Sequence, residues 1–184
     1  MKVGIYTRKG DQGQTLLGSK EKVSKSHQKI VAMGSIDELN AVLGLTVSYV
    51  GAWINKDKII TNIQEDLLLI SAIVSGIPDI EIESDRVAFL EEYIDNVSAS
   101  LKPLNDFVIP GGDPGAAWVY FARTVCRRAE IDLVAVNELD GDVPLNVLIY
   151  MNRLSDLLFV IARRCNNKGE NDILWKRHCP MKGE

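Results

Sequence analysis

Apolar side chains recur every three or four positions along most of this chain, which is the spacing of a helical face that packs on a core. Five such runs occur, over residues 36–54, 59–74, 87–101, 118–136 and 148–162. Prolines lie between the runs at positions 78, 103, 110 and 144, where helices end or begin. The pattern predicts an all-α protein: an up-and-down five-helix bundle that is similar to a four-helix bundle.

Local residues mark the start of the fourth helix and the two ends of the chain. Asp113 followed by Pro114 is typical of an N-cap and a first helical residue. Residues 1–25 are rich in Gly, Lys, Ser and Thr, and we expect a leading loop with a short strand at residues 3–6. Residues 166–184 are expected to form a polar, partly mobile tail. We expect one domain over residues 1–184.

Composition excludes several classes of protein. Hydrophobic residues make up 46% and charged residues 25% of the 184 residues, which is average for globular domains. Apolar stretches are much shorter than the ~20 residues that span a bilayer, so no membrane segment is expected. The N-terminus lacks the apolar core of a signal peptide, so we expect a cytoplasmic protein. Cys126, Cys165 and Cys179 are widely spaced and fit reduced thiols better than disulfides.

The net charge of −4 is unevenly distributed. Residues 1–29 carry seven Lys or Arg and two acids, whereas residues 30–122 carry four Lys or Arg and fourteen acids. Arg123, Arg127 and Arg128 then follow close together. Nucleic-acid binding normally needs an extended basic surface, so this acidic body disfavours it. Compact basic regions suit a small polyanion instead.

The basic leading segment contains TRKGDQGQT at residues 7–15. Its two glycines allow backbone N–H groups to turn toward phosphate oxygens, while Arg8 and Lys9 neutralise charge. It is not a Walker A loop, because the Ser and Lys after Gly18 stand in the wrong order and no strand-to-helix switch follows. A solvated turn without a ligand is the alternative interpretation.

Arg123, Arg127 and Glu130 are spaced by four and three, so they share one face of the fourth helix, opposite its apolar run. They form either an exposed salt-bridged face or part of a ligand site. Asp37 and Glu38 lie inside the apolar start of the first helix, and buried acids need partners. We expect an Asp37–Arg123 pair across two helices, which leaves Arg127 for a ligand phosphate.

Two more segments contain residues that a plain helical bundle does not require. Asn152, Ser155 and Asp156 are mediocre helix formers within the fifth helix, so bonds to another helix or to a ligand are expected. An Arg153–Asp156 ion pair is the structural alternative. Phe107 precedes a Pro-Gly-Gly sequence and either fills the core or projects from a rigid loop into a cavity.

Histidine occurs only at His27 and His178, so Ser-His-Asp and Cys-His catalysis have little support. Neither histidine has the Glu-x-x-His spacing of di-iron bundles, so no protein metal centre is expected. Any chemistry must therefore depend on cations, apolar walls and a reactive cofactor.

Five motifs occur in order along the chain: YTRKGDQGQT at 6–15, GSIDELN at 34–40, FVIPGG at 107–112, ARTVCRRAE at 122–130 and NRLSD at 152–156. Together they resemble the PduO-type ATP:cob(I)alamin (corrinoid) adenosyltransferases, over nearly the whole chain. This resemblance implies a five-helix bundle, a leader loop that wraps ATP, and a homotrimer with active sites between subunits.

The resemblance also implies a reaction. The 5′-deoxyadenosyl group of ATP passes to the cobalt(I) of a corrinoid, cob(I)alamin, and gives adenosylcobalamin and triphosphate. Cobalt(I) is the nucleophile, so the protein supplies positioning and cations and needs no general base. Mg²⁺ is expected to be held mainly through the ATP phosphates. A corrinoid reductase or an adenosylcobalamin-dependent enzyme is the implied protein partner.

Residue roles follow from the matching positions. Expected ATP contacts are Thr7, Arg8, Lys9, Gly10, Thr15, Leu16, Lys25, Arg127, Arg128, Glu130, Ile131 and Asn152. Phe107 matches the aromatic residue that displaces the lower axial ligand of the corrinoid, and Asp37 and Arg123 match an interhelical ion pair near it. His27, Tyr120 and Ile131 depart from the residues common in the family, which are Asp, His and Arg respectively.

Two other classes of function remain compatible with the residues alone. A helical phosphotransferase would also use the basic leader and Arg127, but it would release ADP rather than triphosphate. A non-catalytic helical interaction module would use Arg123, Arg127 and Glu130 to face a partner helix.

Overall fold

The computed structural model describes residues 5–51, 53–54 and 58–175. Within them the long elements are five helices: α1 (Gln28–Val47), α3 (Ile59–Val74), α4 (Ser84–Ser98), α5 (Pro114–Asp140) and α6 (Leu145–Cys165). Four short strands accompany them: β1 (Gln14–Leu16), β2 (Lys22–Ser24), β3 (Val108–Ile109) and β4 (Ile173–Leu174). The predicted all-α bundle is confirmed.

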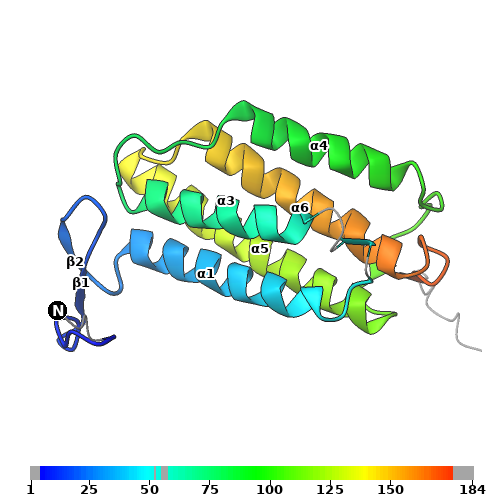
Figure 1. Cartoon of the computed structure of the whole chain (residues 1–184), viewed down its shortest axis with the longest axis horizontal. Helices are drawn as coiled ribbons and strands as arrows, with labels where there is room; N and C mark the ends of the chain where they lie inside the picture. The colour runs from blue at the N-terminus through cyan, green and yellow to red at the C-terminus, as the bar shows by residue number, and fades with distance from the viewer. Residues whose placement is uncertain (1–4, 52, 55–57, 176–184) are drawn as a thin grey trace, which may run out of the picture.

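Successive helices run in alternating directions along one long axis (Figure 1). α5 packs against α1 and α6, α6 also packs against α4, and α1 packs against α3. Their facing sides bury aliphatic side chains, among them Leu39, Leu67, Leu133 and Leu158. Each such side chain contributes roughly 1.5–3 kcal/mol when it leaves water, so this packing is the main source of stability.

Helix α5 begins and ends at residues suited to helix termini. The Asp113 carboxylate accepts a hydrogen bond from the Gly115 backbone N–H at 2.8 Å, and Pro114 is the first helical residue. At the other end Gly141 adopts φ +69°, a left-handed conformation that glycine tolerates at low cost. The predicted Asp113–Pro114 start is confirmed.

The first helix begins and ends earlier than its apolar run, since it starts at Gln28. It ends at Val47 rather than at residue 54, although Val50 and Ile54 are both buried. A turn at residues 48–50 follows the helix, and Ser48 donates its backbone N–H to the Leu45 carbonyl. The apolar spacing therefore continued through a turn that happens to return to the same core.

The buried face of α5 agrees with the predicted run at Val125, Ala129 and Val136 but departs from it at the start of the helix. Ala116, Val119 and Ala122 are buried, whereas Trp118 is half-buried and Phe121 is 46% exposed. Trp118 packs edge-on against Phe121 at the surface, with ring centroids 6.0 Å apart. Both sets of residues have helical spacing. Spacing alone therefore does not distinguish the large aromatic residues from the small residues that allow close packing.

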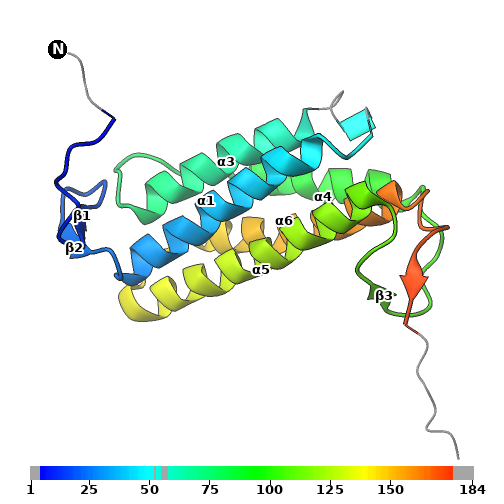
Figure 2. The same cartoon turned by 90° about the horizontal axis from the view of Figure 1, so that it is seen from below.

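The leading segment contains a β-hairpin that was not predicted. Strands β1 and β2 pair antiparallel with Thr15 opposite Val23, and Val23 is buried. The hairpin lies beyond the start of α1 at one end of the bundle (Figures 1 and 2). Of the strand expected at residues 3–6, positions 3 and 4 lie outside the described residues, and Ile5 and Tyr6 are not in a strand.

The start of the C-terminal segment is also more ordered than expected. Asn166 is fully buried, and β4 pairs antiparallel with β3. Of the segment expected to be a polar, partly mobile tail, residues 166–175 thus pack on the rest of the protein, and residues 176–184 lie outside the described part of the chain.

By length and composition, α1 and α6 are each apolar enough to cross a membrane, although no membrane segment was expected. The core helices of soluble proteins meet the same test. In α6 the apolar residues include the fully buried Tyr150, Leu154 and Leu158, which pack inside the bundle.

Candidate functional site

Phe107 projects from the loop between α4 and α5 and is 77% exposed. Its carbonyl accepts a hydrogen bond from the Trp175 backbone N–H at 2.8 Å, and the two rings meet edge-on at 6.2 Å. The adjacent residues Val108 and Ile109 form β3, paired with β4. Phe107 is therefore presented by an anchored loop and does not fill the core.

The loop forms one side of a pocket of about 630 Å³. Residues 104–108 line it together with Arg123, Asp156 and Phe159. The other side thus comes from α5 and α6, so the anchored loop faces two helices of the bundle. The pocket combines two aromatic rings with one cation and two carboxylates, Asp106 and Asp156, which suits a large ligand with both apolar and polar parts.

Two side chains that contact Phe159, which lines this pocket, each have a buried polar atom without a hydrogen bond in the described part of the chain. The Arg123 guanidinium lies over the Phe159 ring at 5.5 Å, and its buried Nε makes no hydrogen bond. The hydroxyl of Tyr120 is also buried without a hydrogen bond, and Tyr120 packs against Phe159 at 6.2 Å. Burial raises the pKa of Tyr120 well above its usual range, so the phenol stays neutral.

The expected Asp37–Arg123 pair does not form within one chain. Asp37 and Glu38 are both exposed, so the expectation of buried acids in α1 is wrong. Glu38 pairs with Arg128 of the antiparallel helix α5. Arg123 lies five residues before Arg128, about 8 Å away along the helix axis, which takes it out of reach of Asp37.

The leader forms a second pocket, of about 640 Å³. The leader hairpin and β3 lie at opposite ends of the bundle (Figure 2). The lining of this pocket consists of Thr7, Lys9, Gly10, Gln14, Thr15, Leu16, Lys22 and Lys25. Three of these residues are lysines and none is acidic, so the pocket favours an anion. A Cβ on Gly10 would lie 3.2 Å from the Lys25 ammonium, so a larger residue there would crowd Lys25.

Not every expected leader contact lines this pocket. Arg8 has φ +59°, and its guanidinium lies over the Tyr6 ring at 5.5 Å instead. Lys22 and Gln14 line the pocket but were not predicted. The hairpin explains both, since Lys22 and Gln14 lie on strands whose pairing was not anticipated.

A third group lies in the middle of α5 and α6. Arg127, Glu130, Ile131, Val134 and Asn152 line a shallow pocket of about 260 Å³. The Asn152 amide donates to the Glu130 carboxylate at 2.9 Å, so part of the NRLSD motif does bond to another helix. Arg128 is engaged with Glu38 and does not line this pocket, and Ile131 is 65% exposed.

One chain keeps these groups apart. Arg127 stands thirteen residues before Asp140, the last residue of α5, which corresponds to about 20 Å of helix. The leader hairpin lies beyond that end of the bundle (Figure 2). A ligand that contacts the leader and Arg127 together therefore needs more than the surface of one chain.

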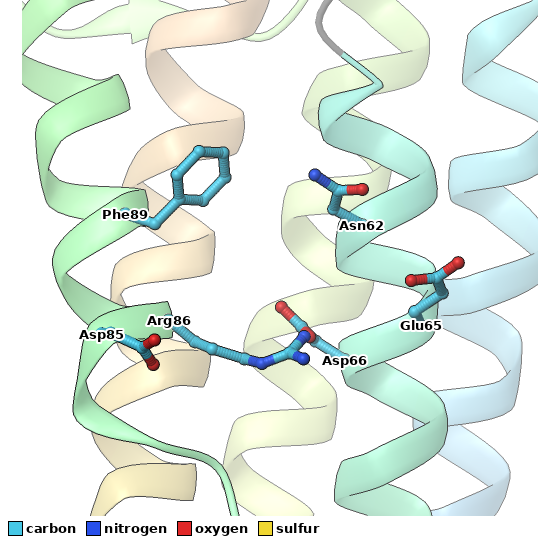
Figure 3. A pocket seen from close by; sticks show the side chains of 6 residues that line it. All are labelled: Asn62, Glu65, Asp66, Asp85, Arg86 and Phe89. Atoms are coloured by element: carbon cyan, nitrogen blue, oxygen red, sulfur yellow. The ribbon is translucent and has the colours of Figure 1, made fainter.

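A further pocket between α3 and α4 contains none of the predicted residues (Figure 3). Asp66, which is 5% exposed, accepts a hydrogen bond from the Tyr150 hydroxyl at 2.7 Å and pairs with Arg86. Both carboxylate oxygens are thus occupied, and burial raises the pKa of Tyr150. We interpret this network as a structural link between α3, α4 and α6.

The described thiols are poor nucleophiles. Burial raises the pKa of Cys126 far above its usual value and that of Cys165 to about 12. Both are unpaired, as the expectation of reduced thiols requires, and Cys179 lies outside the described residues.

Comparison with known proteins identifies the class of protein. The sequence profile of the cobalamin adenosyltransferase family matches residues 5–165. A cobalamin adenosyltransferase of Cupriavidus metallidurans is 39% identical over 176 residues, covering 94% of each chain. A corrinoid adenosyltransferase of Mycobacterium leprae is 38% identical, covering 94% of this chain and 95% of its own.

Solved structures agree with the sequences. A variant of the PduO-type ATP:corrinoid adenosyltransferase from Lactobacillus reuteri, complexed with cobalamin and ATP, superposes with a TM-score of 0.87 at 30% identity. The match covers 95% of this chain and 97% of that one. The chain therefore belongs to the cobalamin adenosyltransferase family.

Proposed function

We propose that this protein transfers the 5′-deoxyadenosyl group of ATP to the cobalt(I) of a corrinoid and releases triphosphate. A bond forms between cobalt and C5′ while the bond from C5′ to the triphosphate oxygen breaks. Cobalt(I) supplies the electron pair, and triphosphate leaves with the pair of the broken bond. The observation that carries this proposal is the exposed Phe107 facing the Arg123–Phe159 wall, in a chain that belongs to this family.

The corrinoid is proposed to occupy the Phe107 pocket. An apolar ring beneath the cobalt excludes water and the lower axial ligand, and a cobalt without axial ligands is easier to reduce. The reaction requires no general base, because no proton is transferred, so Asp106 and Asp156 in the pocket are not assigned that role. The buried Arg123 Nε and Tyr120 hydroxyl are donors that a bound corrinoid or its waters can satisfy.

ATP is proposed to bind through the leader and the middle of α5 and α6. Lys9 and Lys25 neutralise the triphosphate, whose charge as a leaving group grows during the reaction. The remaining expected leader contacts are Thr7, Arg8, Gly10, Thr15 and Leu16. Arg127, Glu130, Ile131 and Asn152 are expected to contact the same nucleotide, and Arg128 to act through its neighbours. Mg²⁺ would be bound mainly by phosphate and water oxygens.

The separation of these groups supports a homotrimer with active sites between subunits. Arg127 lies about 20 Å of helix before the end of α5 beyond which the leader lies, so the two can meet only across a subunit interface. Apolar side chains exposed on α1 and α5 supply such an interface; they are Val31, Leu45, Ile131, Val134 and Leu139. In this assembly Asp37 is expected to pair with the partner subunit's Arg123, since neither finds its partner within one chain. We also propose that residues 1–184 form one domain and that the protein is cytoplasmic. Its protein partner is proposed to be a corrinoid reductase or an adenosylcobalamin-dependent enzyme.

The test is an anaerobic reaction of purified protein with ATP, Mg²⁺ and chemically reduced cob(I)alamin. We expect a light-sensitive alkylcobalamin spectrum and one triphosphate for each adenosylcobalamin formed. Phe107→Ala should slow this reaction while ATP binding persists, and Arg127→Ala should weaken ATP binding. Release of ADP would instead indicate a phosphotransferase. If the folded protein does not bind ATP, the result would favour the non-catalytic interaction module.

A further inference from the structure

The loop that carries Phe107 is fastened at its beginning to the segment that follows α6. The Lys102 carbonyl accepts a hydrogen bond from the Arg163 guanidinium at 2.6 Å, and its backbone N–H donates to the Lys168 carbonyl at 2.9 Å. Arg163 is only 7% exposed. The first contact is therefore a buried, charge-assisted bond, which is stronger than a bond between neutral groups.

The end of the same loop is fastened by a single amide. Asn166 donates to the Gly111 carbonyl at 3.1 Å and accepts from the Asp113 backbone N–H at 2.9 Å. Gly112, between them, has φ +96°, and a Cβ there would lie 2.3 Å from the Asn166 amide oxygen. The Pro-Gly-Gly sequence is therefore explained by the close approach of Asn166 to the backbone.

Asp172 links Arg163 and Asn166, the two side chains that hold the ends of the loop. Its carboxylate accepts from Arg163 Nε at 2.7 Å and from the Asn166 amide at 3.1 Å. Its side chain is 2% exposed, and Asn166 is fully buried. Both amide protons and the amide oxygen of Asn166 are thus in use, which gives the network a defined geometry.

The network also sets the third contact of the loop. Asp172 directly precedes β4, which pairs with β3 and brings the Trp175 backbone N–H to the Phe107 carbonyl. Phe107 itself is mostly exposed, and the edge-on contact with Trp175 restrains only one side of its ring. Its position is determined by the backbone on either side.

We propose that Asn166, Asp172 and Arg163 are positioning residues for the corrinoid reaction, which fix the 102–113 loop so that Phe107 faces Arg123 and Phe159. This inference rests on the proposed function, since it assigns the network a purpose in placing Phe107. Loss of one fastening lets the ring move without removing it. A displacement of about 1 Å in a reacting assembly can reduce its rate by as much as about a hundredfold.

The test compares Asn166→Ala with a matched control, Gln64→Ala. Gln64 also donates its amide to a main-chain carbonyl, that of Asn40 at 3.1 Å, but between α1 and α3. For Asn166→Ala we expect kcat to fall at least about tenfold, with the KM for ATP within about twofold of wild type. The spectrum of bound cob(II)alamin should lose the feature of the form without a lower ligand. Gln64→Ala should retain both.

A double-mutant cycle separates positioning from general weakening. If Asn166 acts through Phe107, adding Asn166→Ala to Phe107→Ala should change kcat by less than about twofold, because there is no ring left to misplace. The same additional factor in both backgrounds would overturn the proposal. Arg163→Lys provides a second route should the buried Asn166→Ala protein not fold, since lysine keeps the charge opposite Asp172 but loses the bond to Lys102.

Hydrogen exchange makes the two proposals separable. Backbone amides of residues 106–113 should exchange faster in Asn166→Ala or Arg163→Lys than in wild type, whatever the protein catalyses. If the wild-type protein is inactive but the variants exchange faster, the proposed function is wrong, while the role of these residues in holding the loop stands. Active wild-type protein with faster exchange but unchanged kcat in the variants would refute the positioning role alone.

Discussion

The backbone N–H of Trp175 donates to the carbonyl of Phe107 at 2.8 Å, and the indole meets the phenyl ring edge-on at 6.2 Å. A residue near the end of the chain thus touches the aromatic group that faces the proposed corrinoid pocket. Such an edge contact contributes about 0.5–1.5 kcal/mol beyond the area it buries. The indole therefore limits how far the Phe107 ring can swing.

Replacing Trp175 by Ala should slow adenosyl transfer about three- to tenfold, in line with the loss of one aromatic contact. The backbone bond to Phe107 survives this change, so the KM for ATP should stay the same. Steady-state kinetics with each substrate varied in turn measures both quantities. Trp175→Phe keeps a ring at this place and should recover most of the rate.

Trp118→Ala is the matched control, because Trp118 also packs edge-on against a phenylalanine but on the outer surface of α5. A rate for Trp175→Ala equal to wild type would show that the indole does not restrain Phe107. Equal losses in both tryptophan variants would point to stability rather than to the Phe107 pocket.

Lys25→Ala should raise the KM for ATP about tenfold or more, because a charge-assisted contact to phosphate is worth about 1.5–3 kcal/mol. The Lys25 side chain lies against Gly10 in a pocket with three lysines and no acid. Titration of ATP binding by calorimetry at two salt concentrations checks this, and the dependence on salt should weaken in the variant. Lys20→Ala removes a lysine of the same hairpin that does not line the pocket, and its affinity should be unchanged.

Much of the fold could be predicted because helical periodicity is a local property. The α3 run and the Asp113–Pro114 start agree with the structure to the residue. The leader hairpin was missed because each strand has three residues and β2 buries only Val23, which gives too little alternation to recognise. The fastening of the Phe107 loop was missed because Asn166 and Gly111 are fifty-five residues apart in sequence.

The candidate site was predicted unevenly for a related reason. An acid inside an apolar run predicts burial at Asp37, yet Asp37 is exposed, whereas Asp66, inside the run of α3, is buried. Spacing shows that a helix has two sides but does not say which side a neighbouring helix covers. The partners of Asp66, Arg86 and Tyr150, come from two other helices and become evident only when the bundle is assembled.

Asp37→Arg should abolish adenosyl transfer if this carboxylate pairs with the partner subunit's Arg123. Arg123→Asp should do the same, and the combined charge reversal should recover at least about tenfold over either single variant, since it restores opposite charges. Sedimentation of each variant distinguishes loss of the assembly from loss of the pocket. If the double variant assembles but does not recover adenosyl transfer, the result would count against the inter-subunit pair.

Tyr150→Phe should destabilise the fold by about 1–3 kcal/mol, because it leaves an oxygen of the buried Asp66 carboxylate without its donor. Arg86 still occupies the other oxygen, so the charge itself stays paired. Urea unfolding should show a lower midpoint with an unchanged slope. Tyr49→Phe removes a hydroxyl from a ring that is 50% exposed and should change stability by less than about 0.5 kcal/mol. This network lies between α3, α4 and α6, away from both Phe107 and the leader. At urea concentrations below those that unfold the protein, kcat and the KM for either substrate should therefore remain within about twofold of wild type. A large loss of activity in folded Tyr150→Phe would mean that the α3–α4 pocket takes part in the reaction.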